Sequence, residues 1–181
     1  MKKSLILIVL LCQYCFAQQP NIFFLLADDL GYGEIGAYGQ KEIQTPVLDS
    51  IAKAGIRFTN AYAGSPVCSP SRAVLMTGIS SSKNTIRGNQ GYDYKSKRLD
   101  RIPLKTSDIT IAEILKEAGY QTGFIGKWHL DHPNQLDTWA HARGFDYAVQ
   151  EQWASPYEGK RYDEQMHWIN GKQDSVYFNL K

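Results

Sequence analysis

The sequence has little cysteine for a protein with the N-terminal pattern described below. It holds three cysteines in 181 residues, and Cys12 and Cys15 lie in the N-terminal segment. Beyond that segment Cys68 is the only thiol, which excludes the internal disulfide framework that stabilises many small secreted proteins. A single thiol in an oxidising compartment is expected to be either buried or used in chemistry.

The sequence also lacks an excess of charge of either sign. Removing Lys2 and Lys3 with the N-terminal segment leaves 18 of the 20 basic residues, equal to the 18 acidic residues. Such a chain has no general electrostatic attraction to nucleic acid or to anionic membranes. Any anion that it binds must be held by a local site, and nucleic acid is not an expected partner.

A long hydrophobic run is absent as well, and the one short run is typical of a targeting signal. Lys2 and Lys3 precede an apolar stretch over residues 5–12, which is shorter than the roughly 20 residues needed to span a bilayer. This layout predicts a secretory signal over residues 1–17. We therefore expect export to the periplasm or the extracellular space without a stable membrane anchor, and a mature region over residues 18–181.

The hydrophobic pattern of the mature region alternates between strands and helices, which indicates an α/β fold. The predicted strands cover residues 22–27, 56–62 and 120–125. The predicted helices begin at Pro46 with Thr45 as the capping residue, at Pro70, and after a cap formed by Thr106, Ser107 and Asp108. The polar stretch 80–106 is expected to run over the surface.

Two neighbouring acids follow the first predicted strand. Asp28 and Asp29 can meet one ligand only if the chain turns just past the strand, and Gly31 and Gly33 would permit that turn. A hard divalent cation would relieve the repulsion between the two carboxylates. A solvated acidic turn is the alternative interpretation.

A lysine and a histidine lie at the end of the third predicted strand. In an extended chain Lys127 and His129 point to one side and Trp128 to the other. An ammonium and an imidazole facing one space can bind an oxyanion and transfer a proton. A surface lysine beside a packed histidine is the alternative.

Cys68 and Arg72 lie four residues apart, at a spacing that brings them together on a short helix. Backbone amides at the start of that helix also point outward towards an anion. A thiolate could be activated there, with His129 as its partner. These residue types and spacings alone leave the kind of chemistry open.

The segment Cys68-Ser69-Pro70-Ser71-Arg72 resembles the Cys-x-Pro-x-Arg signature of the type I sulfatases. Residues 27–33 before it and residues 126–130 after it are similar to two further blocks of that family, in the same order. The resemblance runs from about residue 21 to residue 147. It implies an alkaline-phosphatase-like α/β fold, with a mostly parallel sheet flanked by helices, and hydrolysis of the sulfate ester of a sugar or aryl compound.

The resemblance also implies that Cys68 is oxidised to Cα-formylglycine by a maturation enzyme, which would be a partner of this chain. In the family, one hydroxyl of the aldehyde hydrate attacks sulfur and the alcohol leaves. The other hydroxyl is then deprotonated, which expels sulfate and restores the aldehyde. Oxidation of the lone cysteine would leave no thiol to be damaged after export.

Residue roles follow from the same resemblance, position by position. Asp28, Asp29 and residue 68 would bind a divalent metal, Ca²⁺ or alternatively Mg²⁺, which acts as a Lewis acid. Arg72 would hold the hydrate, Lys127 would bind sulfate oxygen, and His129 would bind the hydrate and the substrate and accept a proton.

The chain departs from the family pattern in two respects. Asp131 stands where a glycine is usual, and the second Asp-Asn metal pair, a further His and a further Lys of full-length members are absent. We therefore expect residues 1–181 to be a truncated catalytic domain that is poorly active or inactive alone.

Other functions remain open at this point. They are an inactive fragment, a related phosphoesterase and a thiol hydrolase that uses Cys68 with His129. The sequence also contains aromatic residues that would either stack on sugar rings or pack a loop, namely Trp153, Tyr157, Tyr162 and Trp168.

Overall fold

The computed structural model describes residues 19–95, 97–151 and 167–174. The predicted signal over residues 1–17 lies outside these ranges, as do Trp153, Tyr157 and Tyr162. The chain divides into two compact units, Met1–Arg57 and Phe58–Lys181. They are called the first and the second unit below, and each is described by itself.

Between residues 19 and 57, the described part of the first unit, lie the α-helix α2 (Pro46–Ala54) and two short 3₁₀ helices, η1 (Tyr32–Glu34) and η2 (Gly36–Tyr38). α2 confirms the predicted helix, with proline in its first turn and Gly55 at its end. Thr45 occupies the predicted capping position, but its hydroxyl makes no capping hydrogen bond to the helix. It accepts instead from the Gly36 N–H at 2.9 Å, and so links η2 to the start of α2.

The predicted strands over residues 22–27 and 56–62 are wrong, since neither segment forms a strand. Phe23 and Leu25 are 90% and 82% exposed, where burial on both faces was expected. A strand is defined by hydrogen bonds to a neighbouring strand. The described residues of the first unit contain no strand with which either segment could pair. Apolar character alone therefore does not make these segments strands.

The second unit opens with a helix and a hairpin. Its first elements are α3 (Cys68–Thr77), β1 (Gly91–Asp93), β2 (Arg98–Asp100) and α4 (Ile111–Glu117). α3 confirms the helix predicted around Pro70 but begins two residues earlier, because proline is tolerated within the first helical turn. This shift makes Cys68 the first residue of the helix.

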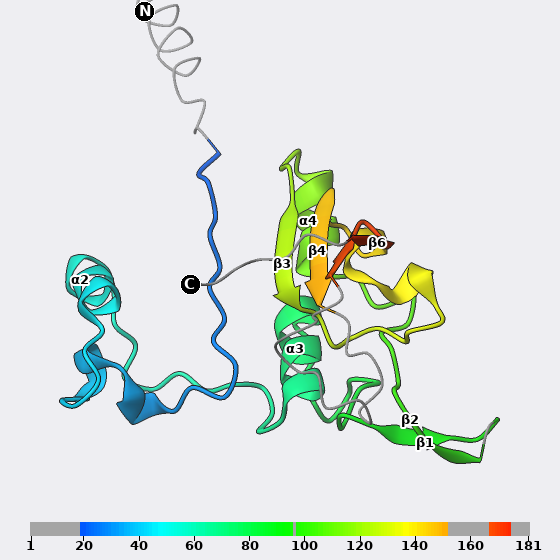
Figure 1. The fold of residues 1–181 in the computed structure, drawn as a ribbon, viewed down its shortest axis with the longest axis horizontal. Helices are drawn as coiled ribbons and strands as arrows, with labels where there is room; N and C mark the ends of the chain where they lie inside the picture. Colours follow the sequence, from blue (N-terminus) through cyan, green and yellow to red (C-terminus); the bar gives the residue numbers. More distant parts are fainter. Residues whose placement is uncertain (1–18, 96, 152–166, 175–181) are drawn as a thin grey trace, which may run out of the picture. The chain divides into compact units, whose positions relative to one another are not determined.

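A four-stranded sheet follows, in the order β3-β4-β5-β6. Its strands are β3 (Gly123–Lys127), β4 (Tyr147–Glu151), β5 (His167–Ile169) and β6 (Lys172–Asp174). The 3₁₀ helices η3 (Leu136–Thr138) and η4 (Ala140–Ala142) lie in the connection from β3 to β4. β3 confirms the third predicted strand, shifted towards the C-terminus. β3 and β4 run parallel (Figure 1), whereas β5 and β6 are antiparallel additions, so the described sheet is mixed.

The core of the second unit surrounds Trp128, which is 1% exposed. Its ring meets Phe124 and Phe145 edge-on, with centroid separations of 5.4 and 5.9 Å. The buried apolar cluster comprises Ala73, Ile86, Leu104, Trp128, Leu130, Ala140 and Ala148. Two of its members come from the stretch 80–106, so the prediction that this stretch only covers the surface is wrong.

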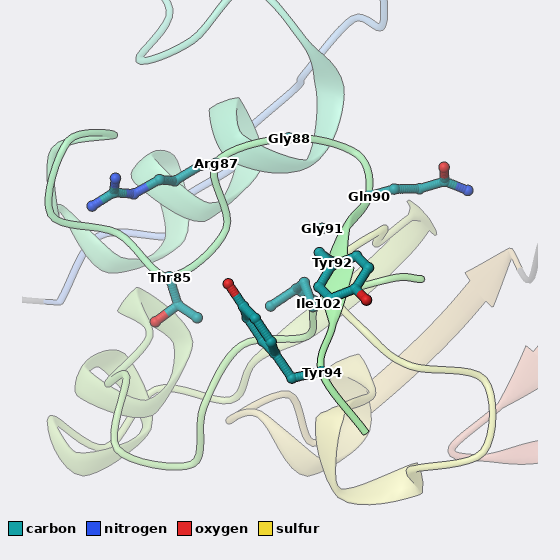
Figure 2. A pocket seen from close by; sticks show the side chains of 8 residues that line it. All are labelled: Thr85, Arg87, Gly88, Gln90, Gly91, Tyr92, Tyr94 and Ile102. Atoms are coloured by element: carbon teal, nitrogen blue, oxygen red, sulfur yellow. The ribbon is translucent and has the colours of Figure 1, made fainter. Parts of the chain in front are cut away.

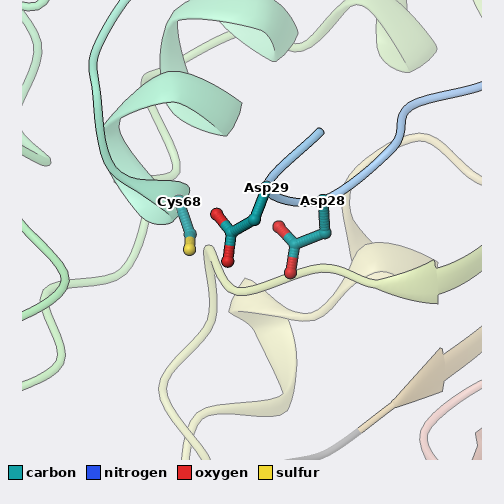
Figure 3. A group of neighbouring side chains, drawn as sticks. All are labelled: Asp28, Asp29 and Cys68. Carbon is teal, nitrogen blue, oxygen red and sulfur yellow. The ribbon is translucent and has the colours of Figure 1, made fainter. Parts of the chain in front are cut away.

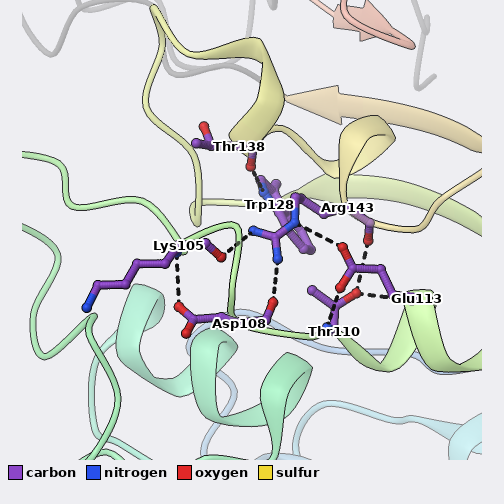
Figure 4. A network of polar contacts seen from close by, with 7 residues as sticks. All are labelled: Lys105, Asp108, Thr110, Glu113, Trp128, Thr138 and Arg143. Atoms are coloured by element: carbon purple, nitrogen blue, oxygen red, sulfur yellow. Dashed lines mark hydrogen bonds and ion pairs between the residues drawn. The ribbon is translucent and has the colours of Figure 1, made fainter.

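Arg143 joins the segment before α4 to the segment before β4 (Figure 4). Its buried guanidinium donates to the Lys105 carbonyl at 3.1 Å, to the Asp108 carbonyl, and to the Glu113 carboxylate at 3.2 Å. The helix cap is Thr110, which forms a reciprocal capping box with Glu113, so the predicted cap at residues 106–108 is wrong. The Thr110 hydroxyl also donates to the Arg143 carbonyl at 3.0 Å, and this long-range bond favours the later start of the helix.

Trp168 lies in β5 and contacts Trp139 edge-on, at a centroid separation of 5.0 Å. This contact favours packing over sugar stacking for Trp168. Across the part of the chain that the structure describes, no helix has the length and apolar character needed to cross a bilayer.

Candidate functional site

Cys68 lies at the start of α3 beside a lysine from the sheet. Its side chain is partly exposed and is not in a disulfide. The Lys127 ammonium, at the carboxyl end of β3, donates to the Cys68 sulfur at 3.4 Å. Residues that are 59 positions apart in the sequence therefore meet where a helix begins and a strand ends. Ligands of α/β proteins commonly bind at such a strand end.

Arg72 links the helix that carries Cys68 to the strand end that carries Lys127. It lies one turn along α3 from Cys68 and is 8% exposed. Its guanidinium donates to the Lys127 carbonyl at 2.5 Å. Two cationic side chains thus lie around residue 68, and the first turn of α3 adds outward-facing amides. This arrangement favours binding of an anion in front of residue 68.

His129 follows β3 in a left-handed backbone conformation, with φ of 57°. The sequence prediction placed Lys127 and His129 on one side of an extended chain, and that reasoning is wrong because the chain is not extended at His129. Trp128 between them is buried in the core, which anchors both neighbours. Histidine adopts this conformation more readily than most residues, and such conformations cluster at functional sites.

The acidic pair belongs to the first unit. Asp28 and Asp29 are exposed, and their carboxylates approach within 4.8 Å of one another. The turn falls on Asp29, whose φ is 57°, whereas Gly31, expected to provide it, has an ordinary φ of −77°. Figure 3 shows both carboxylates turned to the same side of the chain. Two adjacent carboxylates that share a side offer the hard oxygen donors that Ca²⁺ and Mg²⁺ prefer.

Sequence reasoning missed Asn89. Its side-chain oxygen accepts a hydrogen bond at 3.0 Å from the N–H of Ser69, the residue after Cys68. This bond satisfies one of the free amides at the start of α3. Asn89 lies in a polar stretch, 20 positions from its partner, and no local sequence pattern identifies such a contact.

Asp131 was noticed in the sequence only as a departure from the family pattern. The structure shows it 2% exposed, with a carboxylate oxygen 3.9 Å from the guanidinium of Arg101. Nearby, the Leu104 N–H donates to the Leu130 carbonyl at 3.0 Å. These contacts hold the segment after β2 against the segment after β3.

Comparisons with known proteins agree on one family. The family model described as Sulfatase matches residues 20–178. An N-acetylgalactosamine-6-O-sulfatase of Bacteroides thetaiotaomicron is 40% identical over 145 residues, which cover 72% of this chain and 26% of that protein. Human arylsulfatase D is 38% identical over 135 residues, covering 72% of this chain and 23% of that protein. The chain therefore spans about a quarter of the length of these relatives.

Solved structures show the same likeness in three dimensions. The crystal structure of Ps i-CgsB superimposes with a TM-score of 0.73 at 31% identity, over 88% of this chain and 38% of that one. A second crystal structure of Ps i-CgsB, in complex with k-i-k-neocarrahexaose, gives a TM-score of 0.68 at 30% identity, over 82% of this chain and 36% of that one. Together with the family model, these matches establish that the chain belongs to the sulfatase family and has its α/β fold.

Proposed function

We propose that the protein to which this chain belongs hydrolyses sulfate esters, with residue 68 as the source of the nucleophile. The observation that carries the proposal is the cluster at the start of α3. There the Lys127 ammonium lies 3.4 Å from the Cys68 sulfur, and Arg72 is bonded to the Lys127 carbonyl. The sulfatase family supports the same function.

Residue 68 is proposed to act after oxidation to Cα-formylglycine by a maturation enzyme. The hydrated aldehyde would supply an oxygen nucleophile in place of a thiol. The chemistry of the ligand set supports this change, because Ca²⁺ and Mg²⁺ bind oxygen ligands and a thiolate is a soft ligand that suits other metals. Residue 68 would therefore suit the same cation as Asp28 and Asp29 only when it offers an oxygen ligand in place of sulfur.

Three side chains of the second unit have proposed roles around the sulfate group. Lys127 binds a sulfate oxygen and offsets its negative charge. Arg72 positions Lys127 through the strand-end carbonyl and adds positive charge beside residue 68. His129, held next to the buried Trp128, binds the substrate and accepts the proton from residue 68.

Asp28 and Asp29 are proposed to hold a divalent cation, Ca²⁺ or alternatively Mg²⁺. The bound cation supplies Lewis-acid chemistry, stabilising negative charge on sulfate oxygens. The left-handed conformation of Asp29 supports a functional role, because a residue other than glycine is held there by its surroundings.

The proposed substrates are sulfated sugars, with aryl sulfates as the alternative. One relative is named as an N-acetylgalactosamine-6-O-sulfatase, and one similar solved structure is a complex with k-i-k-neocarrahexaose. We further propose export to the periplasm or extracellular space, as the predicted signal over residues 1–17 indicates.

Sulfate release tests the proposal. The protein is produced with and without a formylglycine-generating enzyme and assayed by ion chromatography on N-acetylgalactosamine 6-sulfate and on 4-nitrophenyl sulfate. We expect release only after maturation, loss of release with a chelator, and recovery with Ca²⁺. The matched control is Cys68→Ala, produced with the same maturation enzyme.

Three results would contradict the proposal in different ways. Equal activity in Cys68→Ala would exclude residue 68 as the nucleophile. Faster hydrolysis of 4-nitrophenyl phosphate than of the sulfate would favour a phosphoesterase. Inactivation of the active material by iodoacetamide would favour a thiol hydrolase that uses Cys68 with His129.

A further inference from the structure

The second unit contains a cavity of about 460 Å³ beside the β1–β2 hairpin. It is lined by β1, by the residues just before and after it, and by Ile102 beyond β2 (Figure 2). Its volume falls within the roughly 300–1,000 Å³ typical of small-molecule sites. The proposed roles of Cys68, Arg72, Lys127 and His129 do not use this cavity.

One wall of the cavity is bonded to the reactive end of α3. Gly88 and Gln90 both line the cavity, and Asn89 lies between them. The Asn89 side chain accepts the hydrogen bond from the Ser69 N–H at 3.0 Å. The segment that lines the cavity is therefore hydrogen-bonded to the residue after Cys68, which is the residue proposed to react.

The lining combines the rings of Tyr92 and Tyr94 with polar side chains, one of which, Arg87, is positively charged. Tyr92 and Tyr94 meet edge-on, with centroids 5.0 Å apart and an interplanar angle of 85°. Tyr94 is 85% exposed, so its ring is available to a ligand. Figure 2 shows the Tyr94 hydroxyl directed into the cavity near Thr85, whereas Arg87 and Gln90 extend away from it.

This lining suits a pyranose ring. Aromatic faces pack against the C–H face of a sugar, while hydroxyl groups such as those of Tyr94 and Thr85 bond to its hydroxyls. None of the described residues that line the cavity carries a carboxylate, so none of them repels a sulfated or otherwise anionic sugar. A compact aryl sulfate has no neighbouring sugar ring that could occupy the cavity.

We propose that this cavity is a subsite for the sugar ring that neighbours the sulfated residue, with Tyr94 as its stacking platform. The inference rests on the proposed sulfatase function and makes it more specific. The substrate is an oligosaccharide or polysaccharide, and Tyr94 contributes to specificity without taking part in the bond-breaking step.

Equilibrium binding tests the subsite without requiring turnover. The full-length protein carrying Cys68→Ala is titrated calorimetrically with sulfated hexasaccharides built on galactose, N-acetylgalactosamine and N-acetylglucosamine, and with their desulfated forms. Adding Tyr94→Ala is expected to weaken binding of the sugar by about three- to tenfold, in line with the loss of one aromatic stacking contact. The matched control is Tyr147→Ala, which removes a 48% exposed tyrosine from the end of β4 that pairs with Gly123, away from Lys127.

Turnover by the matured protein provides the second readout. Tyr94→Ala is expected to raise KM for the hexasaccharide by a similar factor and to leave kcat/KM for 4-nitrophenyl sulfate unchanged. Equal losses on both substrates would overturn the subsite, since Tyr94 would then serve the fold or the reaction itself. The subsite would also be overturned if no hexasaccharide binds, or if Tyr147→Ala weakens binding as much as Tyr94→Ala.

The subsite and the proposed function can fail separately. Sulfate release that is insensitive to Tyr94→Ala leaves the sulfatase function intact and removes the subsite. Hexasaccharide binding that depends on Tyr94, in a protein that releases no sulfate after maturation, supports the subsite and contradicts the proposed function.

Discussion

The two units differ in how their elements are held. In the first unit, no residue between 19 and 57 is buried, and α2 exposes its apolar side chains, including Val47 at 70% and Ile51 at 58%. In the second unit, Trp128 is enclosed by apolar neighbours and Arg143 bridges three segments. Local signals such as Pro46 suffice to form a helix, whereas strands form only where a partner strand is present.

The contrast matters for the proposed function because each unit contains residues with a proposed role. The first unit supplies Asp28 and Asp29 on exposed backbone. The second supplies Cys68, Arg72 and Lys127 from a helix and a strand that the core holds together. Substitution of either carboxylate is therefore expected to leave the fold of the second unit intact. The same substitution is expected to impair catalysis.

The largest expected effect separates catalysis from stability in the first unit. Asp29→Ala should lower the rate of sulfate release at least about 100-fold, because it removes a proposed ligand of the Lewis acid. The unfolding midpoint of the second unit, followed by tryptophan fluorescence, should not change, and all four tryptophans of the chain belong to that unit. Glu42→Ala is the matched control, since Glu42 is an exposed carboxylate of the same unit. An equal loss of sulfate release in both variants would show that Asp29 has no special role.

The next effect tests packing in the second unit through two glycines with nearly the same backbone conformation. Gly144 and Gly119 have φ of 91° and 88°. A Cβ on Gly144 would overlap the backbone of Ala112 and Glu113, whereas one on Gly119 meets no atom within 4 Å.

Gly144→Ala should therefore cost about 3 kcal/mol or more, from overlap added to the unfavourable φ, and Gly119→Ala about 1 kcal/mol from the φ alone. Urea unfolding measures both free energies. Equal losses would show that the close approach at Gly144 does not contribute to stability.

A smaller effect compares the helix starts of the two units. Thr110→Ala should lower the free energy of unfolding by about 1–2 kcal/mol, because it removes a cap and the bond to the Arg143 carbonyl. Thr45→Ala in the first unit removes no capping bond to α2, so the unfolding of the second unit should remain unchanged. A Thr110→Ala variant as stable as the parent protein would show that the capping box is not needed.

The smallest effect concerns pH. The hydrogen bond from Lys116, helped by the Thr122 amide, lowers the pKa of Asp146 from 3.8 to about 2. The folded state thus binds this proton less tightly than the unfolded state, so the carboxylate stabilises the fold above about pH 4, and that contribution is lost as the pH falls towards 2. Asp146→Asn should flatten the decline of stability across this window, as measured by urea unfolding.

The sequence predicted the elements whose signals are local. Pro46 and Gly55 bound α2, Gly78 follows α3, and the β3 strand ends at Lys127, as expected within a few residues. The cluster of Cys68, Arg72 and Lys127 was also foreseen in part, since helical spacing and a strand end are both visible in sequence.

Long-range contacts were not predictable from sequence. The buried Arg143 and the Asn89 bond to Ser69 depend on segments that meet only after folding. The helix cap is Thr110 rather than the predicted residues 106–108, because the Thr110 hydroxyl bonds to the Arg143 carbonyl and forms a capping box with Glu113. The strand predicted over residues 22–27 does not form. An apolar run indicates burial, but it does not specify the strand with which the segment would pair.

The central claim is that oxidised residue 68 performs sulfate ester hydrolysis, and one measurement tests it most directly. Samples of the protein are matured to different extents, the aldehyde fraction at residue 68 is measured by peptide mass spectrometry, and kcat for sulfate release is plotted against that fraction. The account predicts a straight line through the origin. Sulfate release at full rate from a sample in which residue 68 is entirely cysteine would contradict it.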